Sequence, residues 1–498
     1  MPHTTVAIIG SGFAGLGMGA RLAQAGMRDF LILERAADLG GTWRDNTYPG
    51  AECDVPSHLY SFSFFQNPRW SQSFSGQAEI QQYLQDCADH FGLRPHLRLG
   101  HELVDARWDD TAQLWNIETS QGPLTAQFLI SGMGSLAEPA LPDVPGIDRF
   151  KGAMFHSARW DHDHDLTGER VAVVGTGASA IQFVPQIVDR VGHLDLYQRT
   201  APWIIPRRNR RLSHVEQRLF ARFPALQHAQ RSAIYWSREA YVLGFRRPDP
   251  VMGLPARVAR RHLAQQVPDP RLRATLTPDY TIGCKRILIS NDYYPALTRP
   301  HVDVVPAGLT EIRERAVIAA DGVERPADTI IFGTGFQVTE FPAGRRLRGR
   351  EGRTLHEEWS DGAQAHLGCT VHGYPNLFLV VGPNTGLGHT SMVYMIEAQV
   401  QYILEALRWM FRRGLRTFEV TAAAQAAYND RLQERMRDTV WTTGGCASWY
   451  LDDTGRNTTL WPDFTWRFKH QTRRFDPESY RFRVADPLPA DVAHLHSV

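Results

Sequence analysis

Two glycine-rich segments have the spacing of dinucleotide-binding loops. In the first, Gly10, Gly12 and Gly15 follow an apolar run at residues 5–9 and lead into a helical pattern rich in alanine and leucine. The first glycine permits a tight turn, the second lets a pyrophosphate approach the backbone, and the third lets the helix pack on the strand. With Ala14 between them, these glycines predict a nucleotide site at the start of the chain.

The same plan recurs later in the sequence. An apolar run at residues 171–174 leads into Gly175, Gly177 and Ala180, and a helical stretch continues to about residue 191. Alanine replaces the third glycine, which a helix–strand contact tolerates. We expect the start of this helix to face a second pyrophosphate, with three contributing residues: Thr176, Gly177 and Ser179.

The residue that ends the second strand separates the two sites. It stands 24 positions beyond the first glycine in each unit, and it is Glu34 in the first and Arg199 in the second. A carboxylate accepts hydrogen bonds from ribose hydroxyls and repels a 2′-phosphate, whereas a guanidinium pairs with that phosphate. We therefore predict an unphosphorylated dinucleotide such as FAD in the first site and NADP in the second. Two alternatives stay open: a structural turn of another α/β fold, and a solvated Arg199.

Two doubly wound units are needed to hold these loops. Residues 103–129 alternate like an antiparallel meander, and the proline-rich residues 138–145 are typical of a linker. Late apolar runs at residues 329–332 and 377–381, each followed by glycine, indicate that the chain returns to the first unit. We predict an α/β fold with two Rossmann-like domains, for FAD and NADP, and a helical insertion. The expected parts are FAD domain 1–140 and 326–483, NADP domain 141–206 and 276–325, insertion 207–275, and flexible tail 484–498.

The expected insertion is rich in arginine. Ser213 and Glu216 have the spacing of a capping box, and one helical face follows before Pro224 breaks the run, formed by Leu212, Val215, Leu219 and Phe223. We interpret the segment as an inserted helical subdomain, and a membrane-surface helix is the weaker alternative.

Composition excludes several classes of protein. The 498 residues are 43% hydrophobic, which excludes overall disorder, and 54 basic residues against 53 acidic ones argue against a nucleic-acid-binding protein. Apolar runs stay far below the roughly 18–20 residues of a membrane helix, and a glycine motif stands where a signal peptide would have its apolar region. The five cysteines are widely spaced, which gives little support to a disulfide scaffold, zinc site or dithiol enzyme. We expect a cytoplasmic protein without stable membrane insertion.

Two longer patterns carry a family resemblance. Phe150, Gly152, His156, Trp160 and Asp161 match the F-x-G-x-x-x-H-x-x-x-W-[P/D] fingerprint of type I Baeyer–Villiger monooxygenases, which are FAD- and NADPH-dependent class B flavoprotein monooxygenases. A second element resembles the same family through Gly41, Trp43, Tyr48, Pro49, Gly50 and Asp54. The resemblance runs from about residue 6 to about residue 450. One departure is Gly333, where the family usually has alanine.

The resemblance implies the chemistry. NADPH and O2 would be used to insert one oxygen atom next to a ketone carbonyl through a peroxyflavin anion, giving an ester or lactone. Arg286 would stabilise this anion because a guanidinium stays protonated when desolvated, and Asp54 would orient it. On the NADP side the resemblance implies Lys285, Thr200 and Trp449, together with Arg286. On the flavin side it implies Gly41, Thr42, Trp43, Asp54, Tyr60 and Val104. Asn384 precedes a helical pattern that begins near residue 389, and this spacing predicts a helix N-terminus directed at the flavin ring.

Other interpretations remain. A flavin monooxygenase that oxidises soft sulfur or nitrogen nucleophiles has the same two domains, although Trp160 and Asp161 favour the enzymes that oxidise ketones. A flavoprotein that binds both nucleotides without turnover is the third alternative. His156 and Trp160 are expected to couple the domains rather than to act in catalysis. His162 and His164 alternate with aspartates, which indicates a solvated acidic turn rather than a metal site, so no metal is predicted.

Overall fold

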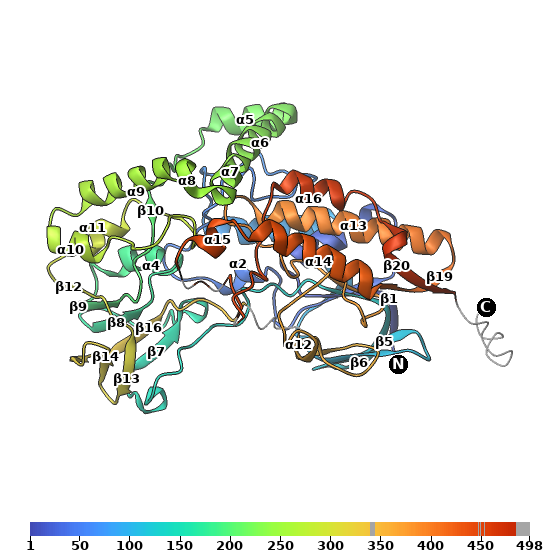
Figure 1. Ribbon diagram of the computed structural model, residues 1–498, viewed down its shortest axis with the longest axis horizontal. Helices are drawn as coiled ribbons and strands as arrows, with labels where there is room; N and C mark the ends of the chain where they lie inside the picture. The colour runs from blue at the N-terminus through green and yellow to red at the C-terminus, as the bar shows by residue number, and fades with distance from the viewer. Residues whose placement is uncertain (339–343, 447, 449, 453, 485–498) are drawn as a thin grey trace.

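The largest sheet is built from both ends of the chain (Figure 1). The computed structural model describes residues 1–338, 344–446, 448, 450–452 and 454–484. The strand order is β17-β4-β5-β6-β1-β2-β3, with β18 also paired to β6. The strands are β1 (His3–Ile9), β2 (Phe30–Leu33), β3 (Leu97–Arg98), β4 (Leu103–Asp109), β5 (Leu114–Thr119), β6 (Gly122–Ser131), β17 (Leu347–Arg348) and β18 (Leu377–Leu379). β1 runs parallel to β2 and β6, and β4, β5 and β6 form the predicted antiparallel meander.

The second sheet has five strands, and all its pairs are parallel, in the order β12-β9-β8-β16-β7. They are β7 (Ala153–His156), β8 (Arg170–Val174), β9 (His193–Tyr197), β12 (Val302–Val305) and β16 (Thr329–Phe332). A small antiparallel sheet follows, with β13 (Leu309–Arg313), β14 (Ala316–Ala319) and β15 (Glu324–Pro326). Because β16 lies between β8 and β7, the chain leaves this sheet after Phe332, later than the expected boundary at residue 326. The buried run 329–332 is equally suited to either sheet, and only strand pairing decides.

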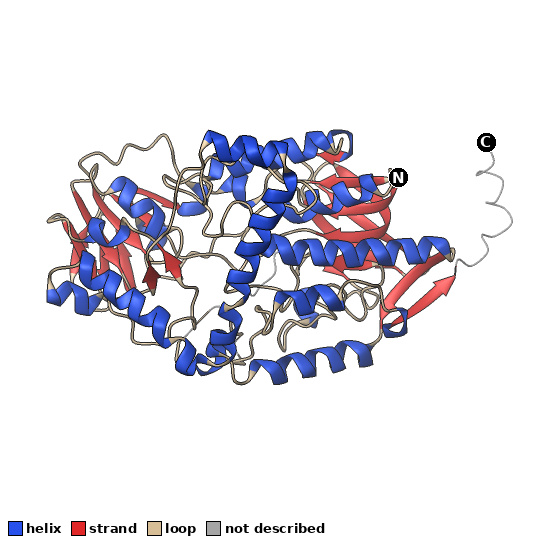
Figure 2. Ribbon diagram, turned by 90° about the horizontal axis from the view of Figure 1, so that it is seen from above, coloured by secondary structure: helices blue, strands red, loops and turns tan. Residues whose placement is uncertain are grey.

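Helices fill the space between and around the sheets, which lie at opposite ends of the molecule in Figure 2. Those near the first sheet are α1 (Phe13–Gln24), α2 (Thr42–Asp45), α3 (Gln77–His90), α12 (Leu355–Glu358), α13 (Met392–Arg412), α14 (Ala422–Met436), α15 (Val440–Thr443) and α16 (Thr465–Gln471). α1 packs against α13, and both bury apolar residues in one core. α4 (Ala180–Ile187) and α11 (Tyr293–Leu297) belong to the second core. This arrangement confirms the predicted α/β class.

Short elements complete the described chain. Two parallel strands, β10 (Ile204–Ile205) and β11 (Leu288–Ile289), join the ends of the insertion. β19 (Leu415–Val420) pairs antiparallel with β20 (Tyr480–Val484). Single 3-10 turns are η1 (Arg94–His96), η2 (Ile147–Arg149), η3 (Ser157–Arg159) and η4 (Pro477–Ser479). Apart from Val484, the expected tail lies outside the described residues.

The insertion consists of helices that run along the upper edge of Figure 1 and down to its left side. They are α5 (His214–Arg222), α6 (Pro224–Glu239), α7 (Tyr241–Arg246), α8 (Pro248–Val251), α9 (Gly253–Gln266) and α10 (Pro270–Thr275). The predicted capping box is present at the start of α5, where Ser213 and Glu216 satisfy each other's backbone amides. Pro224 ends α5 and also opens α6, because proline is tolerated in the first turn of a helix.

No helix of the described segments is both long and apolar enough to cross a bilayer.

Candidate active site

The first glycine loop connects β1 to α1. Gly10 has a positive φ of 94°, and its amide donates a hydrogen bond to the carbonyl of Leu33, 2.7 Å away. A β-carbon at Gly15 would overlap the carbonyl oxygen of Gly10, so the helix approaches the strand only because this residue is glycine. A β-carbon at Gly12 would meet only Gly40 and Gly41 backbone, at 3.8 Å or more. The loop therefore leaves its backbone open to a ligand.

Glu34 is buried beside this loop and is already held by donors. Its carboxylate accepts hydrogen bonds from the amide and hydroxyl of Ser11, at 3.0 and 2.7 Å, and pairs with Arg44 at 2.9 Å. Burial acts to raise the pKa of Glu34, but hydrogen bonds from Ala36 and Ser11 and the charge of Arg44 lower it below its usual value. The side chain is a fixed anion at neutral pH.

The second glycine loop has the same backbone form. Gly175 has a φ of 107°, and α4 begins at Ala180. A β-carbon at Gly333 would lie 3.3 Å from the β-carbon of Ala180. The glycine at 333 therefore gives room to the alanine at the third position of the loop. Thr176 donates a hydrogen bond to the carbonyl of Thr200 at 3.2 Å, which joins the loop to the end of β9.

Two positive side chains stand at the end of β9. Arg199 is exposed, and within the described chain no ion pair includes it or Lys285. The pKa of Lys285 is lowered, first by burial and then by the charge of Arg199. The ammonium of Lys285 lies 5.2 Å from the ring centroid of Tyr280. Two neighbouring cations form a site that suits a multiply charged anion such as a phosphate.

Arg286 and Asp54 form a bidentate ion pair between the first and the second nucleotide-binding unit. Nε and Nη2 of Arg286 donate to the two carboxylate oxygens of Asp54, at 2.6 and 2.7 Å. The Arg286 Nη1 atom also donates to the carbonyl of Leu387 at 3.3 Å. The side chains are 33% and 25% exposed. The guanidinium of Arg286 is thus held in one orientation, while part of the side chain remains exposed.

This pairing keeps both groups charged. Burial acts to raise the pKa of Asp54, but the charge and hydrogen bonds of Arg286 lower it below its usual value. The charge of Asp54 in turn raises the pKa of Arg286. The arrangement supplies a permanent, partly buried positive charge at a fixed position.

Two residues near this pair escaped prediction as site residues. Arg238, from α6 of the insertion, interacts electrostatically with Asp54 and Arg286, and burial lowers its pKa. Burial also raises the pKa of Tyr450 to about 12, while the charge of Arg286 opposes this. Tyr450 directly follows Trp449, which the resemblance implies as a cofactor residue, so a signal existed for it. Arg238 is one of many arginines in the insertion, and no sequence spacing distinguishes it.

Several of the expected flavin-side residues lie on or next to α2, and Asn384 lies on the segment that precedes α13. The indole of Trp43 donates to the hydroxyl of Tyr60 at 3.1 Å, and α2 begins at Thr42 after Gly41. Asn384 is buried, and its Oδ1 atom has no hydrogen-bond partner within the described chain. Val104 is exposed on β4. Trp449 lies outside the described residues.

One disulfide corrects the expectation from the cysteines. Cys284 and Cys446, 162 positions apart, are bonded, whereas Cys53, Cys87 and Cys369 are buried free thiols. The amide of Thr281 also donates to the carbonyl of Gly444 at 3.0 Å. The bond ties the segment that carries Lys285 and Arg286 to the loop before Tyr450. Spacing alone did not reveal it because the two cysteines meet only in the folded chain.

The fingerprint residues extend from the segment just before β7, through the end of β7 at His156, to the turn after it. His156 is buried, and its Nδ1 atom accepts a hydrogen bond from the amide of Ala158 at 3.1 Å. Trp160 packs on Phe183 of α4, with ring centroids 5.3 Å apart.

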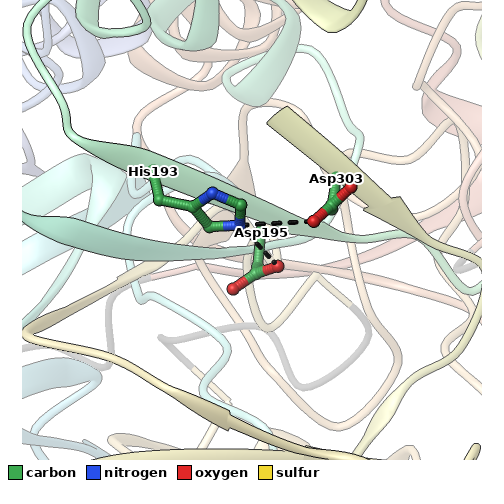
Figure 3. A group of neighbouring side chains, drawn as sticks. All are labelled: His193, Asp195 and Asp303. Atoms are coloured by element: carbon green, nitrogen blue, oxygen red, sulfur yellow. Dashed lines mark ion pairs between the residues drawn. The ribbon is translucent and has the colours of Figure 1, made fainter. Parts of the chain in front are cut away.

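Histidines near carboxylates have separate partners. His162 contacts Thr47 at 2.8 Å, and His164 contacts Glu169 at 3.0 Å, so the two do not converge on one point. Figure 3 shows another group, in which His193 lies between Asp195 and Asp303 at 3.4 and 3.3 Å. His193 begins β9, at the amino end of the sheet, whereas nucleotides bind at carboxyl ends. This group is separate from the candidate site.

Comparisons with known proteins agree on one family. The family model described as "Pyridine nucleotide-disulphide oxidoreductase" matches residues 7–240. The chain is 52% identical to a Baeyer-Villiger monooxygenase of Streptomyces coelicolor, with 98% of this chain and 94% of the relative covered. It is 51% identical to a Baeyer-Villiger monooxygenase of Pseudomonas aeruginosa, with 98% and 93% covered. Cyclohexanone monooxygenase from Rhodococcus sp. Phi1, solved with NADP+, is 26% identical with a TM-score of 0.86, and 97% of this chain and 100% of that chain are covered.

Proposed function

The chain belongs to the Baeyer–Villiger monooxygenases, and on this premise we propose that Arg286 and Asp54 form its oxygenation centre. The protein is an NADPH-dependent flavoprotein monooxygenase that inserts an oxygen atom next to a ketone carbonyl. The two-point pair between these side chains, placed where the nucleotide units meet, is the observation that carries the proposal. We further propose O2 as the source of the inserted oxygen.

FAD fits the first site. The open backbone at Gly12, the held carboxylate of Glu34 and the buried, unpartnered Oδ1 of Asn384 suit a dinucleotide with an uncharged ribose edge and a polar ring. Trp43 and Tyr60 would flank the ring system. When bound, FAD takes electrons from NADPH and delivers them to oxygen. The residues around it orient the ring and exclude water.

Arg286 supplies the charge that this reaction needs. Negative charge develops on oxygen during the transfer, and a fixed guanidinium stabilises it without reorganisation. Asp54 holds the guanidinium plane, and Arg238 and Tyr450 lie within electrostatic reach of the pair. We assign Asp54 as the residue that directs Arg286.

NADP fits the second site. Arg199 and Lys285 would bind the 2′-phosphate, and Thr176, Gly177 and Ser179 at the start of α4 would face the pyrophosphate. Thr200 and Trp449 keep the roles that the resemblance implies. Lys285 and Arg286 are neighbours in the chain, so one segment would serve both the phosphate and the reacting centre.

The domain assignments follow from these sites. FAD would be held by the parts before residue 141 and after β16, and NADP by the parts around the five-stranded sheet. We place the protein in the cytoplasm because its reductant is NADPH.

Product analysis tests the proposed function. FAD-loaded protein is given NADPH, isotopically labelled O2, a panel of cyclic, linear and aryl ketones, and a thioether. We expect an ester or lactone that carries one labelled oxygen, detected by gas chromatography and mass spectrometry. Sulfoxide as the sole product would assign the protein to heteroatom oxidation instead. NADPH consumption with hydrogen peroxide and no organic product would contradict oxygenation of this panel.

A further inference from the structure

Helix α6 is oriented against the usual rule for amphipathic helices. Its buried residues are polar or amphipathic, namely Gln227, Arg231, Tyr235 and Glu239. Its exposed residues include an apolar stripe at helical spacing, formed by Leu226, Ala229, Ala233, Trp236 and Ala240. A helix normally buries the apolar stripe, so this one presents a surface that suits a partner.

The inward orientation is well determined. The guanidinium of Arg231 donates to the backbone carbonyls of three residues, His58, Leu59 and Ser61, at 2.8, 3.0 and 2.8 Å. Glu239 accepts hydrogen bonds from the amide and hydroxyl of Thr465, at 2.9 and 2.7 Å, and contacts His389 at 3.1 Å. These buried charged contacts fix the polar side of α6 on the body of the protein, because removing them would leave unpaired polar groups. The apolar stripe must therefore face outward.

Neighbouring helices of the insertion add to the same surface. Half of the large exposed hydrophobic side chains among the described residues, ten of twenty, lie between residues 215 and 258. They are Val215, Leu219, Phe223, Leu226, Trp236, Tyr241, Leu243, Val251, Leu254 and Val258. Figure 1 shows α5 and α6 rising above the rest of the molecule, with α8 and α9 continuing along the same edge. We call these ten residues the insertion face.

The insertion is also strongly basic. Residues 207–266 contain thirteen arginines and three acidic residues, although the whole chain has a net charge of +1. The exposed arginines are Arg208, Arg210, Arg211, Arg218, Arg222, Arg247, Arg257, Arg260 and Arg261. On α9 the residues Leu254, Arg257, Val258 and Arg261 share one exposed side of the helix. Apolar and cationic side chains therefore stand together on the exposed side of α9.

This composition selects the partner. A second copy docked through the same face would bring two strongly basic surfaces together, which is unfavourable. An anionic lipid surface satisfies both features, because the apolar side chains enter the boundary between headgroups and acyl chains while arginines pair with phosphates. We propose that the insertion face docks the enzyme on the surface of an anionic phospholipid bilayer. The sequence left a membrane-surface helix as the weaker alternative, and the outward stripe of α6 is what now favours it.

Vesicle co-sedimentation of the FAD-loaded protein tests this proposal. The vesicles contain either phosphatidylcholine alone or phosphatidylcholine with an equal share of phosphatidylglycerol, at low and high salt. We expect binding to the anionic vesicles, with the bound fraction falling at high salt, and little binding to the neutral ones. The double variants L226S/W236S and R257E/R261E should each weaken binding about tenfold or more.

Matched controls separate this surface from general effects. Leu141→Ser and Val323→Ser change exposed apolar residues elsewhere, and Arg149→Glu and Arg315→Glu change exposed arginines elsewhere. These variants should bind vesicles like the parent. NADPH oxidation in vesicle-free buffer should be the same for all variants, which shows that they fold.

Three outcomes would overturn the proposal. These are no binding to anionic vesicles, equal loss of binding in the control variants, and a change of oligomeric state by L226S/W236S in mass photometry without a change in lipid binding. The last result would assign the face to a contact between subunits.

Discussion

The two glycine loops have the same backbone form, but the charged side chains beside them differ in burial and in pairing. At the first site, Glu34 is buried and held in place by Ser11, Ala36 and Arg44. At the second site, Arg199 is exposed, and burial and the charge of Arg199 lower the pKa of Lys285. The carboxylate of the first site is held in place without a ligand. At the second site, the repulsion between the two cations is neutralised only when an anion binds. We propose that the loop geometry selects a dinucleotide and that the charge at the strand end selects which dinucleotide binds.

Arg286 stands where the two sites meet, and its loss should have the largest effect. In Arg286→Ala we expect ester formation to fall by about 10²- to 10³-fold, because one preorganised charged donor is lost. FAD content should stay normal, since the first loop is unchanged. Product yield and hydrogen peroxide release per NADPH measure this. As a control, Arg350→Ala breaks a pair with Asp110 on the rim of the first sheet and should leave the yield unchanged. Normal ester yield from Arg286→Ala would refute its assignment.

Arg199→Ala tests the charge difference directly. We expect the KM for NADPH to rise about 10- to 100-fold, the cost of one or two charge-assisted hydrogen bonds, while the KM for NADH changes little. FAD affinity should be unaffected. Arg190→Ala, which removes an exposed arginine paired with Asp165 on the same unit, is the matched control. An equal rise in the KM for NADPH and for NADH would contradict the assignment of Arg199 to the 2′-phosphate.

Removing the disulfide with Cys446→Ser should affect the second site more than the first. The bond closes a long loop, so we expect the free energy of unfolding to fall by about 2–4 kcal/mol. Lys285 and Arg286 follow Cys284 directly, so NADPH affinity should fall more than FAD affinity. Denaturant unfolding, thiol titration and titrations with each cofactor measure these effects. A variant with unchanged stability and unchanged NADPH affinity would contradict this role.

Glu34→Gln should weaken FAD binding about tenfold, because an amide is a poorer acceptor for ribose hydroxyls and leaves Arg44 without its partner. The pH dependence follows from the lowered pKa of Glu34. Its carboxylate stabilises the fold above the unfolded pKa of about 4.3, and this contribution is lost as the pH falls through the lower folded value. Thermal melting of the apoprotein on acidification should therefore show a smaller loss in the variant. An identical acid profile for both proteins would argue against a held carboxylate.

The smallest expected effect concerns the coupling between Arg199 and Lys285. Because burial and Arg199 lower the pKa of Lys285, NADPH affinity should decline as the pH rises, at a lower pH than for an ordinary lysine. In Arg199→Gln the like charge is gone, so the midpoint of this decline should move to higher pH. Titrations of NADPH binding across alkaline pH measure it. A midpoint that does not move would show that the two cations act independently.

Much of the fold was predictable because the signals are local. The run 329–332 coincides with β16, and the capping box of Ser213 and Glu216 is present as expected. Turn geometry and capping depend on neighbours in the chain, so spacing is sufficient to predict them. The sheet to which β16 belongs was wrongly placed, since a buried strand matches either sheet until its partners are known.

By itself, the sequence determined the two nucleotide loops, the opposite charges at their strand ends, and the fingerprint that indicates the family. The tertiary structure decided which distant groups act together. It placed Asp54 on Arg286, brought Arg238 from the insertion toward them, joined Cys284 to Cys446, and turned the apolar stripe of α6 outward. The physical reason is the distance along the sequence over which each interaction acts. The backbone conformation of a loop depends on residues only a few positions apart. Charge pairing and burial, in contrast, depend on surfaces that meet only after hundreds of residues have folded.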